Sequence, residues 1–128
     1  MSKWVGLGFM LAGILAGCKS PMGIAMSSPE QLHQAYFYDL CDSWLIMKEP
    51  RVLDELRNRN LYTAKEMEQI RSHTISVGMA ESAARCSWGK PAYENVSNFG
   101  GGQLVQWVYR DAGSYVYIKD EKVSGYQN

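Results

Sequence analysis

The sequence lacks any concentrated run of basic residues. Its 13 lysines and arginines are dispersed among 13 aspartates and glutamates, and the formal net charge is zero. Proteins that bind nucleic acid generally need a basic surface that neutralises phosphates. We therefore expect no nucleic-acid partner, and the charge pattern is typical of a solvated, mixed-charge surface.

Histidine is scarce, and no cysteine lies in a C-x-x-C motif or at a Cys/His spacing typical of a metal site. We expect no metal, no cofactor and no small-molecule substrate. One catalytic alternative remains open: a thiol activated by an imidazole, either Cys86 with His73 or Cys41 with His33. It requires a reduced cysteine, and we expect a non-enzymatic protein instead.

Charge is nearly absent from residues 1–17, where Lys3 is the only charged side chain. The apolar stretch from residue 4 to residue 15 is too short to span a bilayer, which needs about 20 apolar residues. A basic start, an apolar core and small residues before a cysteine have the layout of a secretion signal. We expect residues 1–17 to be removed, which leaves residues 18–128.

The segment Leu15-Ala16-Gly17-Cys18 resembles the lipobox of bacterial lipoproteins. The resemblance implies a diacylglyceryl group on the Cys18 thiol, cleavage before Cys18 and acylation of the new amino terminus. Two or three acyl chains anchor a protein lastingly, whereas one chain does so only marginally. Lys19 replaces the aspartate that favours inner-membrane retention in the enterobacterial pattern, so we expect the outer membrane, facing the periplasm. An ordinary signal with a chance cysteine, or an uncleaved anchor, is the alternative.

With lipid on Cys18, two cysteines remain, Cys41 and Cys86. An even pair in an oxidising compartment is typical of a structural disulfide. The alternative is two buried free thiols.

Residues 18–27 contain Pro21 and Gly23 and show no periodic apolar pattern, which predicts a short lipidated tether. A helix then begins with Ser28 as N-cap, Pro29 at the first position and Gln31 completing a capping box. Apolar residues recur at helical spacing as far as Pro50. They predict one helix whose buried stripe is Leu32, Ala35, Tyr36, Leu40, Trp44 and Met47.

Two further helices are predicted before residue 78. Residues 51–59 present Val52, Leu53 and Leu56 on one face, and a second capping box joins Thr63 to Glu66. Buried positions of the last helix are expected at Met67, Ile70 and Val77. Residues 28–77 are therefore predicted to form a compact helical region.

From Gly78 the pattern changes. Residues 79–87 predict a short helix, which Gly89 ends and Pro91 prevents from continuing. Alternating apolar residues then predict strands at 103–110, 115–119 and 122–126, with 93–99 as an additional edge strand. The expected fold is α+β, with helices on one face of a three- to four-stranded antiparallel meander, and 78–128 forms one domain with 28–77.

The C-terminal half of the mature chain resembles the SmpA/OmlA (BamE-like) lipoprotein domain. Such domains share a helix ending in a G-x-P turn, a W-x-Y strand and a last strand pair around a tight turn. The residues that carry the resemblance are Gly78-Met79, Trp88-Gly89-Lys90-Pro91, Gln106-Trp107-Val108-Tyr109, Tyr115-Val116-Tyr117, Lys122-Val123 and Gln127-Asn128. The resemblance implies two helices on a three-stranded sheet and a role supporting the outer membrane or its β-barrel assembly machinery. Region 28–77 is longer than the usual lead-in of that family.

Aromatic residues concentrate on the predicted strands, and alternation places about half of them toward the helices. The others would be exposed, and exposed Trp and Tyr are common in binding hot spots. The alternative is an aromatic core with a wet outer face. The binding candidates are Trp107, Tyr109, Tyr115 and Tyr117.

Gly100, Gly101 and Gly102 predict a hairpin loop, because a β-rich segment follows where a phosphate loop would lead into a helix. Glycines also allow a partner's backbone to approach closely, which makes this loop a further binding candidate. We expect a protein-binding or assembly accessory at the outer membrane, with an envelope protein as partner. The alternative is an inhibitor or exclusion factor, encoded on a mobile element, that binds an envelope protein or a secreted enzyme.

Overall fold

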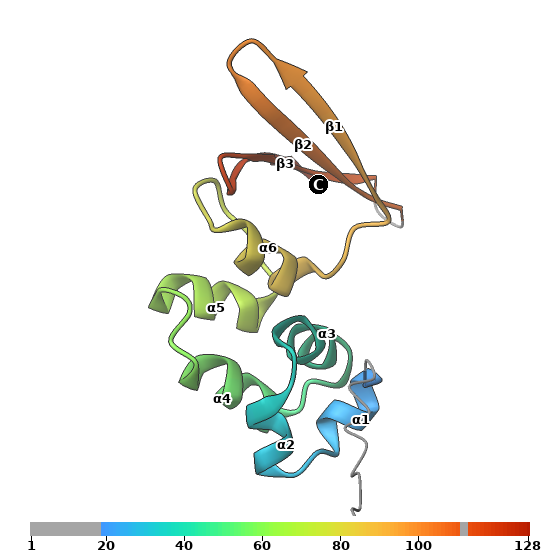
Figure 1. The fold of residues 1–128 in the computed structure, drawn as a ribbon, viewed down its shortest axis with the longest axis vertical. Helices are drawn as coiled ribbons and strands as arrows, with labels where there is room; N and C mark the ends of the chain where they lie inside the picture. Colours follow the sequence, from blue (N-terminus) through green and yellow to red (C-terminus); the bar gives the residue numbers. More distant parts are fainter. Residues whose placement is uncertain (1–18, 111–112) are drawn as a thin grey trace, which may run out of the picture.

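The computed structural model describes residues 19–110 and 113–128 of the 128-residue chain. Cys18 and the lipobox lie outside the described residues, as do two residues of the predicted turn at 111–113. No helix in the described part is long and apolar enough to cross a membrane. Described helices and strands follow one another in two blocks (Figure 1): α1 Pro21–Ala25, α2 Pro29–Gln34, α3 Phe37–Met47, α4 Pro50–Asn58, α5 Ala64–Ser72, α6 Glu81–Trp88, β1 Tyr93–Phe99, β2 Gly102–Tyr109, β3 Ser114–Lys119 and β4 Lys122–Gln127.

The predicted tether at residues 18–27 is wrong for the described residues, because they contain α1. Ser20 accepts a hydrogen bond from the Gly23 amide at 3.1 Å and so caps the helix. Ile24 is 1% exposed, and the Ser43 hydroxyl donates to the Pro21 carbonyl at 2.7 Å. A helix that buries a single side chain gives no repeating apolar pattern in the sequence. The structure therefore reveals α1 through its packing against α3.

The predicted helix from residue 29 to residue 47 is divided into α2 and α3. The capping box of Ser28 and Gln31 is present, which confirms the predicted start. Ala35 and Tyr36 are extended, however, with ψ angles of 148° and 138°. The Arg59 guanidinium compensates for the interrupted helix, since it donates to the carbonyls of Leu32, His33 and Ala35 at 2.9–3.1 Å. Tyr36 is consequently 65% exposed rather than buried.

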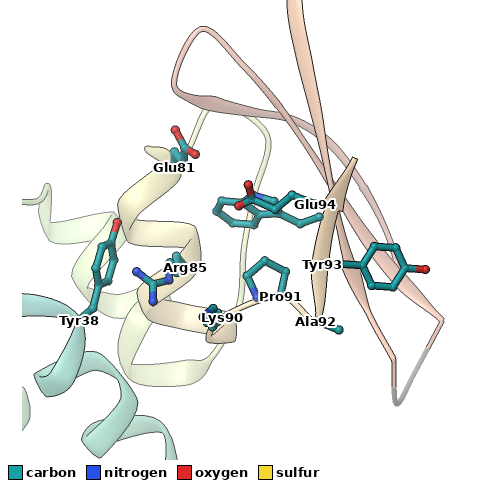
Figure 2. Close-up of a pocket in the computed structure, with 9 residues that line it drawn as sticks. Tyr38, Glu81, Arg85, Lys90, Pro91, Ala92, Tyr93 and Glu94 are labelled. Carbon is teal, nitrogen blue, oxygen red and sulfur yellow. The ribbon is translucent and has the colours of Figure 1, made fainter. Parts of the chain in front are cut away.

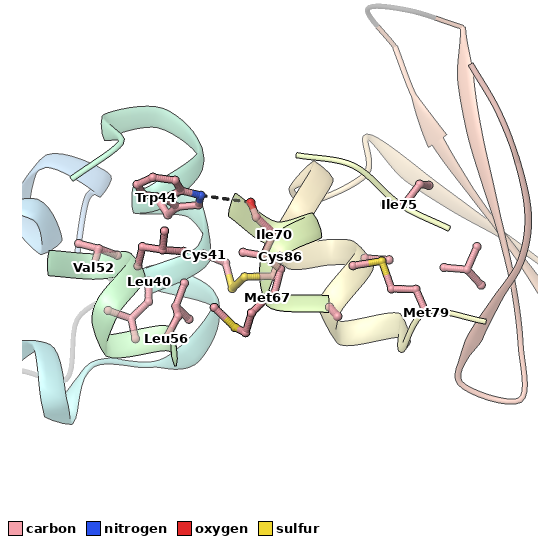
Figure 3. Packing of buried hydrophobic residues seen from close by; sticks show 14 of the residues in the cluster. Leu40, Cys41, Trp44, Val52, Leu56, Met67, Ile70, Ile75, Met79 and Cys86 are labelled. Atoms are coloured by element: carbon pink, nitrogen blue, oxygen red, sulfur yellow. Dashed lines mark hydrogen bonds between the residues drawn. A yellow bond between two sulfur atoms is a disulfide. The ribbon is translucent and has the colours of Figure 1, made fainter. Parts of the chain in front are cut away.

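The helices α4 and α5 have the predicted buried faces: Val52, Leu53, Leu56, Met67 and Ile70. The Trp44 indole N–H donates to the Ile70 carbonyl at 3.2 Å and holds α5 against α3 (Figure 3). Val77 is 64% exposed, so its predicted burial is wrong. The reason is that α5 ends at residue 72, after which His73 adopts a left-handed conformation and Ile75 takes the buried position.

One glutamate connects α5 to α6. The predicted capping box is present, because Thr63 caps the Glu66 amide and the Glu66 carboxylate accepts from the Thr63 amide at 3.2 Å. Its other oxygen accepts from the Ala80 amide, the N-cap of α6, at 2.9 Å. Gly89 ends α6 with φ of 85°, and a Cβ there would lie 2.8 Å from the Leu45 side chain. Both conformation and space therefore require glycine, which confirms the predicted stop.

The strands form one antiparallel sheet in the order β1-β2-β3-β4, which confirms the meander and gives it four strands. Residues before α6 run beside β4, where the Gly78 amide donates to Val123 at 2.8 Å and the Val123 amide donates to Met79 at 2.9 Å. These bonds attach the helical half directly to the edge of the sheet.

A single hydrophobic core extends from the helices to the inner face of the sheet. Helix α6 lies between the sheet and the remaining helices (Figure 1, Figure 3). A disulfide between Cys41 and Cys86 crosses from α3 to α6, with 4.8 Å between the Cα atoms, so the predicted pairing is confirmed. The structure has the predicted α+β class, with helices packed against one face of a small antiparallel sheet.

Candidate functional site

Two of the four aromatic binding candidates lie on the helix-facing side of the sheet. Trp107 is 2% exposed and belongs to the core. Tyr109 is half-buried, donates its hydroxyl to the Gly89 carbonyl at 2.9 Å and packs edge-on against Trp88. Burial raises the pKa of the Tyr109 phenol above its ordinary value. Both side chains serve the packing of α6 on the sheet, so Trp107 is not exposed and Tyr109 only partly; contact of either with a partner stays a prediction.

The other two candidates, Tyr115 and Tyr117, lie on the outer face. Tyr115 pairs across β2 with Val108, which in turn pairs with Tyr93 of β1. Paired residues on antiparallel strands have adjacent side chains. Val108 is only 7% exposed although it lies outside the main core, because the two tyrosines flank it, whereas Tyr93 is 50% exposed.

Beside this aromatic row, polar side chains are hydrogen-bonded across all four strands. The Asn95 amide donates to the Gln106 carbonyl oxygen at 3.0 Å, and the Gln106 amide donates to the Tyr117 hydroxyl at 3.3 Å. That hydroxyl donates in turn to Gln127 at 3.5 Å. We call the two rows together the outer sheet face: Tyr93, Val108, Tyr115, Asn95, Gln106, Tyr117 and Gln127. None of these seven residues is charged, although the exposed Lys119 continues the same face of β3 two positions after Tyr117. No helix of the described chain covers them (Figure 1).

Gly100, Gly101 and Gly102 lie at the tip of the hairpin between β1 and β2, as predicted for a loop. All three are exposed, and no atom lies within 4 Å of a Cβ built on any of them. The hairpin extends beyond the helices along the long axis of the molecule (Figure 1). Two apolar side chains on β1 that were not among the candidates are exposed there, Val96 at 53% and Phe99 at 66%. The sequence could have indicated these two residues, because both are apolar and lie in the segment 93–99, which was predicted to be an edge strand.

A cleft of about 390 Å³ lies between α3, α6 and the start of β1 (Figure 2). The Arg85 guanidinium stacks 3.6 Å from the centre of the Tyr38 ring. Neither Arg85 nor Lys90, which lines the same cleft, forms an ion pair with another described residue. Because neither cation is paired with a carboxylate of the described residues, both are available to an anionic group. On β1, Tyr93 points away from the cleft while Glu94 lies over it (Figure 2).

The cleft is electrostatically mixed, because carboxylates line it beside the cations. Burial raises the pKa of Glu81, and the Glu94 and Glu121 carboxylates raise it further. Trp107 also lines this cleft, and its indole nitrogen is buried and has no hydrogen-bond partner among the described residues. The chemistry available here is recognition of a polar group rather than a nucleophilic attack. The sequence alone did not indicate this cleft.

The alternative of a thiol enzyme requires a free cysteine, but both Cys41 and Cys86 are disulfide-bonded in this structure. Instead, His73 has a packing role: its Nδ1 lies 3.1 Å from the Ser87 carbonyl and its ring stacks on Trp44. Burial lowers the pKa of His73 and the nearby Lys48 ammonium lowers it further, against the opposing effect of the Ser87 carbonyl. Among the described residues, no group of three or more His, Cys, Asp or Glu side chains is placed to hold a metal.

No protein-family model matches the chain, and comparisons with curated proteins and with solved structures find no match either. The similarity of residues 78–128 to the SmpA/OmlA domain therefore stays a prediction from its motifs. The lipidation candidate Cys18 likewise stays a prediction, because it lies outside the described residues.

Proposed function

We propose that this protein is a lipid-anchored, non-enzymatic module of the bacterial cell envelope that binds another protein through the outer sheet face. The observation that carries the proposal is the partly exposed surface on which tyrosine and amide side chains from all four strands are joined by hydrogen bonds, with the exposed Lys119 of β3 at its end. Tyrosine is enriched at protein interfaces, where lysine and the acidic residues are depleted.

The envelope location rests on two independent features. The lipobox resemblance at residues 15–18 implies a lipid on Cys18. The Cys41–Cys86 disulfide agrees with it, because disulfides persist in oxidising compartments such as the periplasm. Within the envelope we propose an accessory role at the outer membrane, similar to that of BamE-like lipoproteins.

The size of the surface argues that the hairpin takes part in binding. Four strands spaced about 4.8 Å apart, each contributing about six residues of 3.3 Å, give a face of roughly 400 Å². A stable protein interface needs about 800 Å² from each partner. The exposed Phe99 and Gly100–Gly102 adjoin the face and supply further area, whereas Val96 pairs with Val105 and lies on the other side of the hairpin. The partner therefore contacts both the outer sheet face and the hairpin.

The projecting hairpin also favours the alternative function, an inhibitor or exclusion factor. A slender hairpin with a three-glycine tip has the shape to enter the cleft of a target protein, because glycine allows close backbone approach. The two functions share one chemistry, protein recognition, and differ in the identity of the partner.

Site-specific photo-crosslinking in intact cells tests this proposal. A photoreactive amino acid replaces Tyr117 on the outer sheet face, and in a control chain it replaces Lys65, which is exposed on α5. We expect a discrete adduct from position 117 that is reduced by Phe99→Ser, and none from position 65. Mass spectrometry of the adduct distinguishes an outer-membrane assembly protein from an inhibited enzyme. An adduct from position 65 alone would reject the outer sheet face as the binding surface.

A further inference from the structure

Helix α1 and its C-cap residue expose two methionines, four and eight positions after the cysteine that we propose is lipidated. Met22 is 57% exposed and Met26 is 79% exposed. They are four residues apart, so they lie on the same side of α1. Ile24, between them in the sequence, points the opposite way into the core and is 1% exposed. Helix α1 therefore has one face buried by the protein and one apolar face that the described protein leaves uncovered.

The last turn of α3 extends this apolar surface. Ile46 is 63% exposed and Met47 is 37% exposed. They follow Ser43 by three and four residues, and Ser43 is the α3 residue that hydrogen-bonds to Pro21 of α1. Residues at these spacings share a side of a helix.

The C-terminal end of α1 is also held in place, by Arg51. The Arg51 guanidinium donates to the Ala25 carbonyl at 3.2 Å and to the Ser27 carbonyl at 2.7 Å. Because Arg51 follows Met47 by only four residues, α1 runs from Ser43 toward the end of α3. We call Met22, Met26, Ile46 and Met47 the methionine patch.

The position of the lipid relative to this patch is limited by the length of the chain. Four residues separate Cys18 from Met22, and an extended chain spans at most about 3.6 Å per residue. The lipidated residue therefore lies within about 14 Å of Met22. Helix α1 is attached to the domain by Ile24 and by the Ser43–Pro21 hydrogen bond, so only Lys19 and Ser20 separate Cys18 from a helix that is fixed to the domain.

We propose that the methionine patch lies against the surface of the bilayer that holds the Cys18 lipid. The proposal rests on the lipidation in the proposed function. Apolar side chains on a short helix favour the boundary between head groups and acyl chains, and the flexible thioether of methionine adapts to such an irregular environment. Lys19, exposed between the anchor and α1, contacts anionic head groups. A bilayer is the occupant because the anchor keeps it at high effective concentration beside the patch.

This contact orients the whole molecule. Helix α1 and the tip of the β1–β2 hairpin lie toward opposite ends of the long axis (Figure 1). With α1 on the bilayer, the hairpin projects into the aqueous compartment, where a partner protein reaches the outer sheet face. The domain is thus held close to the membrane in one orientation rather than suspended at a variable distance.

Fluorescence quenching on vesicles tests the contact. An environment-sensitive fluorescent amino acid replaces Met26 in the full lipidated protein, and in a control chain it replaces Ser97 on the hairpin. Both proteins are reconstituted into phosphatidylethanolamine–phosphatidylglycerol vesicles that contain lipids brominated near the head group. We expect the probe at position 26 to be quenched at least about twofold more than the probe at position 97. A second chain with the probe at position 46 and the substitutions Met22→Ser and Met26→Ser should lose quenching while its melting temperature is unchanged.

Flotation of the same vesicles separates this inference from the proposed function. Protein that floats but shows equal quenching at positions 26 and 97 would overturn the membrane contact and leave the lipid anchor intact. Protein that fails to float would overturn the anchor, and the contact with it.

Discussion

Cys41 and Cys86 are bonded through their sulfur atoms, and their Cα atoms lie 4.8 Å apart. Both side chains are buried, one on α3 and the other on α6. Since α6 packs against the sheet, the bond joins the helical region at residues 28–77 to the sheet-forming half at 78–128. Loss of this bond should therefore affect the stability of the whole domain.

Removing the disulfide with Cys41→Ala and Cys86→Ala should lower the free energy of unfolding. The two cysteines are 45 positions apart, for which the chain-entropy model gives roughly 4 kcal/mol. Urea denaturation of the variant measures the change, and reduction of the unaltered protein should produce a similar loss. Alkylation of both cysteines in unreduced protein extracted from the envelope would show that the bond does not form in the cell.

Glu66→Gln should destabilise the junction between α5 and α6 by about 1–2 kcal/mol, because an amide nitrogen cannot accept the hydrogen bond from Ala80. The pKa of Glu66 is below its ordinary value: burial raises it, but bonds from the Ala80 and Thr63 amides outweigh that effect. Its contribution to stability is thus present above the unfolded pKa and is lost as pH falls through the lower folded pKa. Urea titrations between about pH 3 and 6 should show a weaker acid dependence in Glu66→Gln, with Glu30→Gln as control; equal slopes would contradict this.

Two substitutions should distinguish the structural role of the inner face of the sheet from the binding role of its outer face. Trp107→Ala should cost about 3–5 kcal/mol of stability, since its side chain is in the core. Tyr93→Ala, at a half-exposed position, should leave the melting temperature nearly unchanged and weaken capture of the partner identified by crosslinking at position 117. Undiminished capture by Tyr93→Ala and by Tyr117→Ala would move the binding site away from the outer sheet face.

His73 should make the domain less stable in mild acid. Its folded pKa is lowered by burial and by Lys48, so the folded state binds its proton less readily than the unfolded state does. Its contribution is present above the unfolded value, about 6.5, and is lost as pH falls through the folded pKa. In His73→Asn, which keeps a residue that tolerates the left-handed conformation, thermal melting should depend less on pH below about 6.5. The exposed His33→Asn serves as control, and an unchanged dependence in the His73 variant would refute the assignment.

Cys18→Ser should abolish lipid labelling and leave the protein either unprocessed or released from the membrane. Metabolic labelling with a fatty acid, followed by fractionation, measures both outcomes. A labelled, membrane-bound mature form of this variant would show that Cys18 is not the anchor.

Several elements were predictable because their interactions are local. The capping boxes at Ser28–Gln31 and Thr63–Glu66 join residues three positions apart, and both helices begin as predicted. The alternation of apolar residues predicted the strand at 103–110, and in β2 the alternating Val105, Trp107 and Tyr109 do pack toward the core. Outward placement of Tyr115 and Tyr117 follows once the core face is known, because neighbouring strands are in register.

Tertiary contacts decided the features that the local pattern misrepresented. The apolar stripe from Leu32 to Met47 was compatible with one helix, but Arg59 stabilises the break between α2 and α3 from 24 or more positions away. Residues 19–27 resembled a tether because α1, although capped by Ser20, is too short to show a periodic apolar pattern and depends on packing Ile24 against the domain. Thus the sequence by itself determined the starts of α2 and α5, the strand alternation and the even pair of cysteines, since each depends on neighbours or on composition. Only the tertiary structure decided which face of the sheet is free and that the helix beside Cys18 is fixed to the domain, because both depend on contacts between segments distant in the chain.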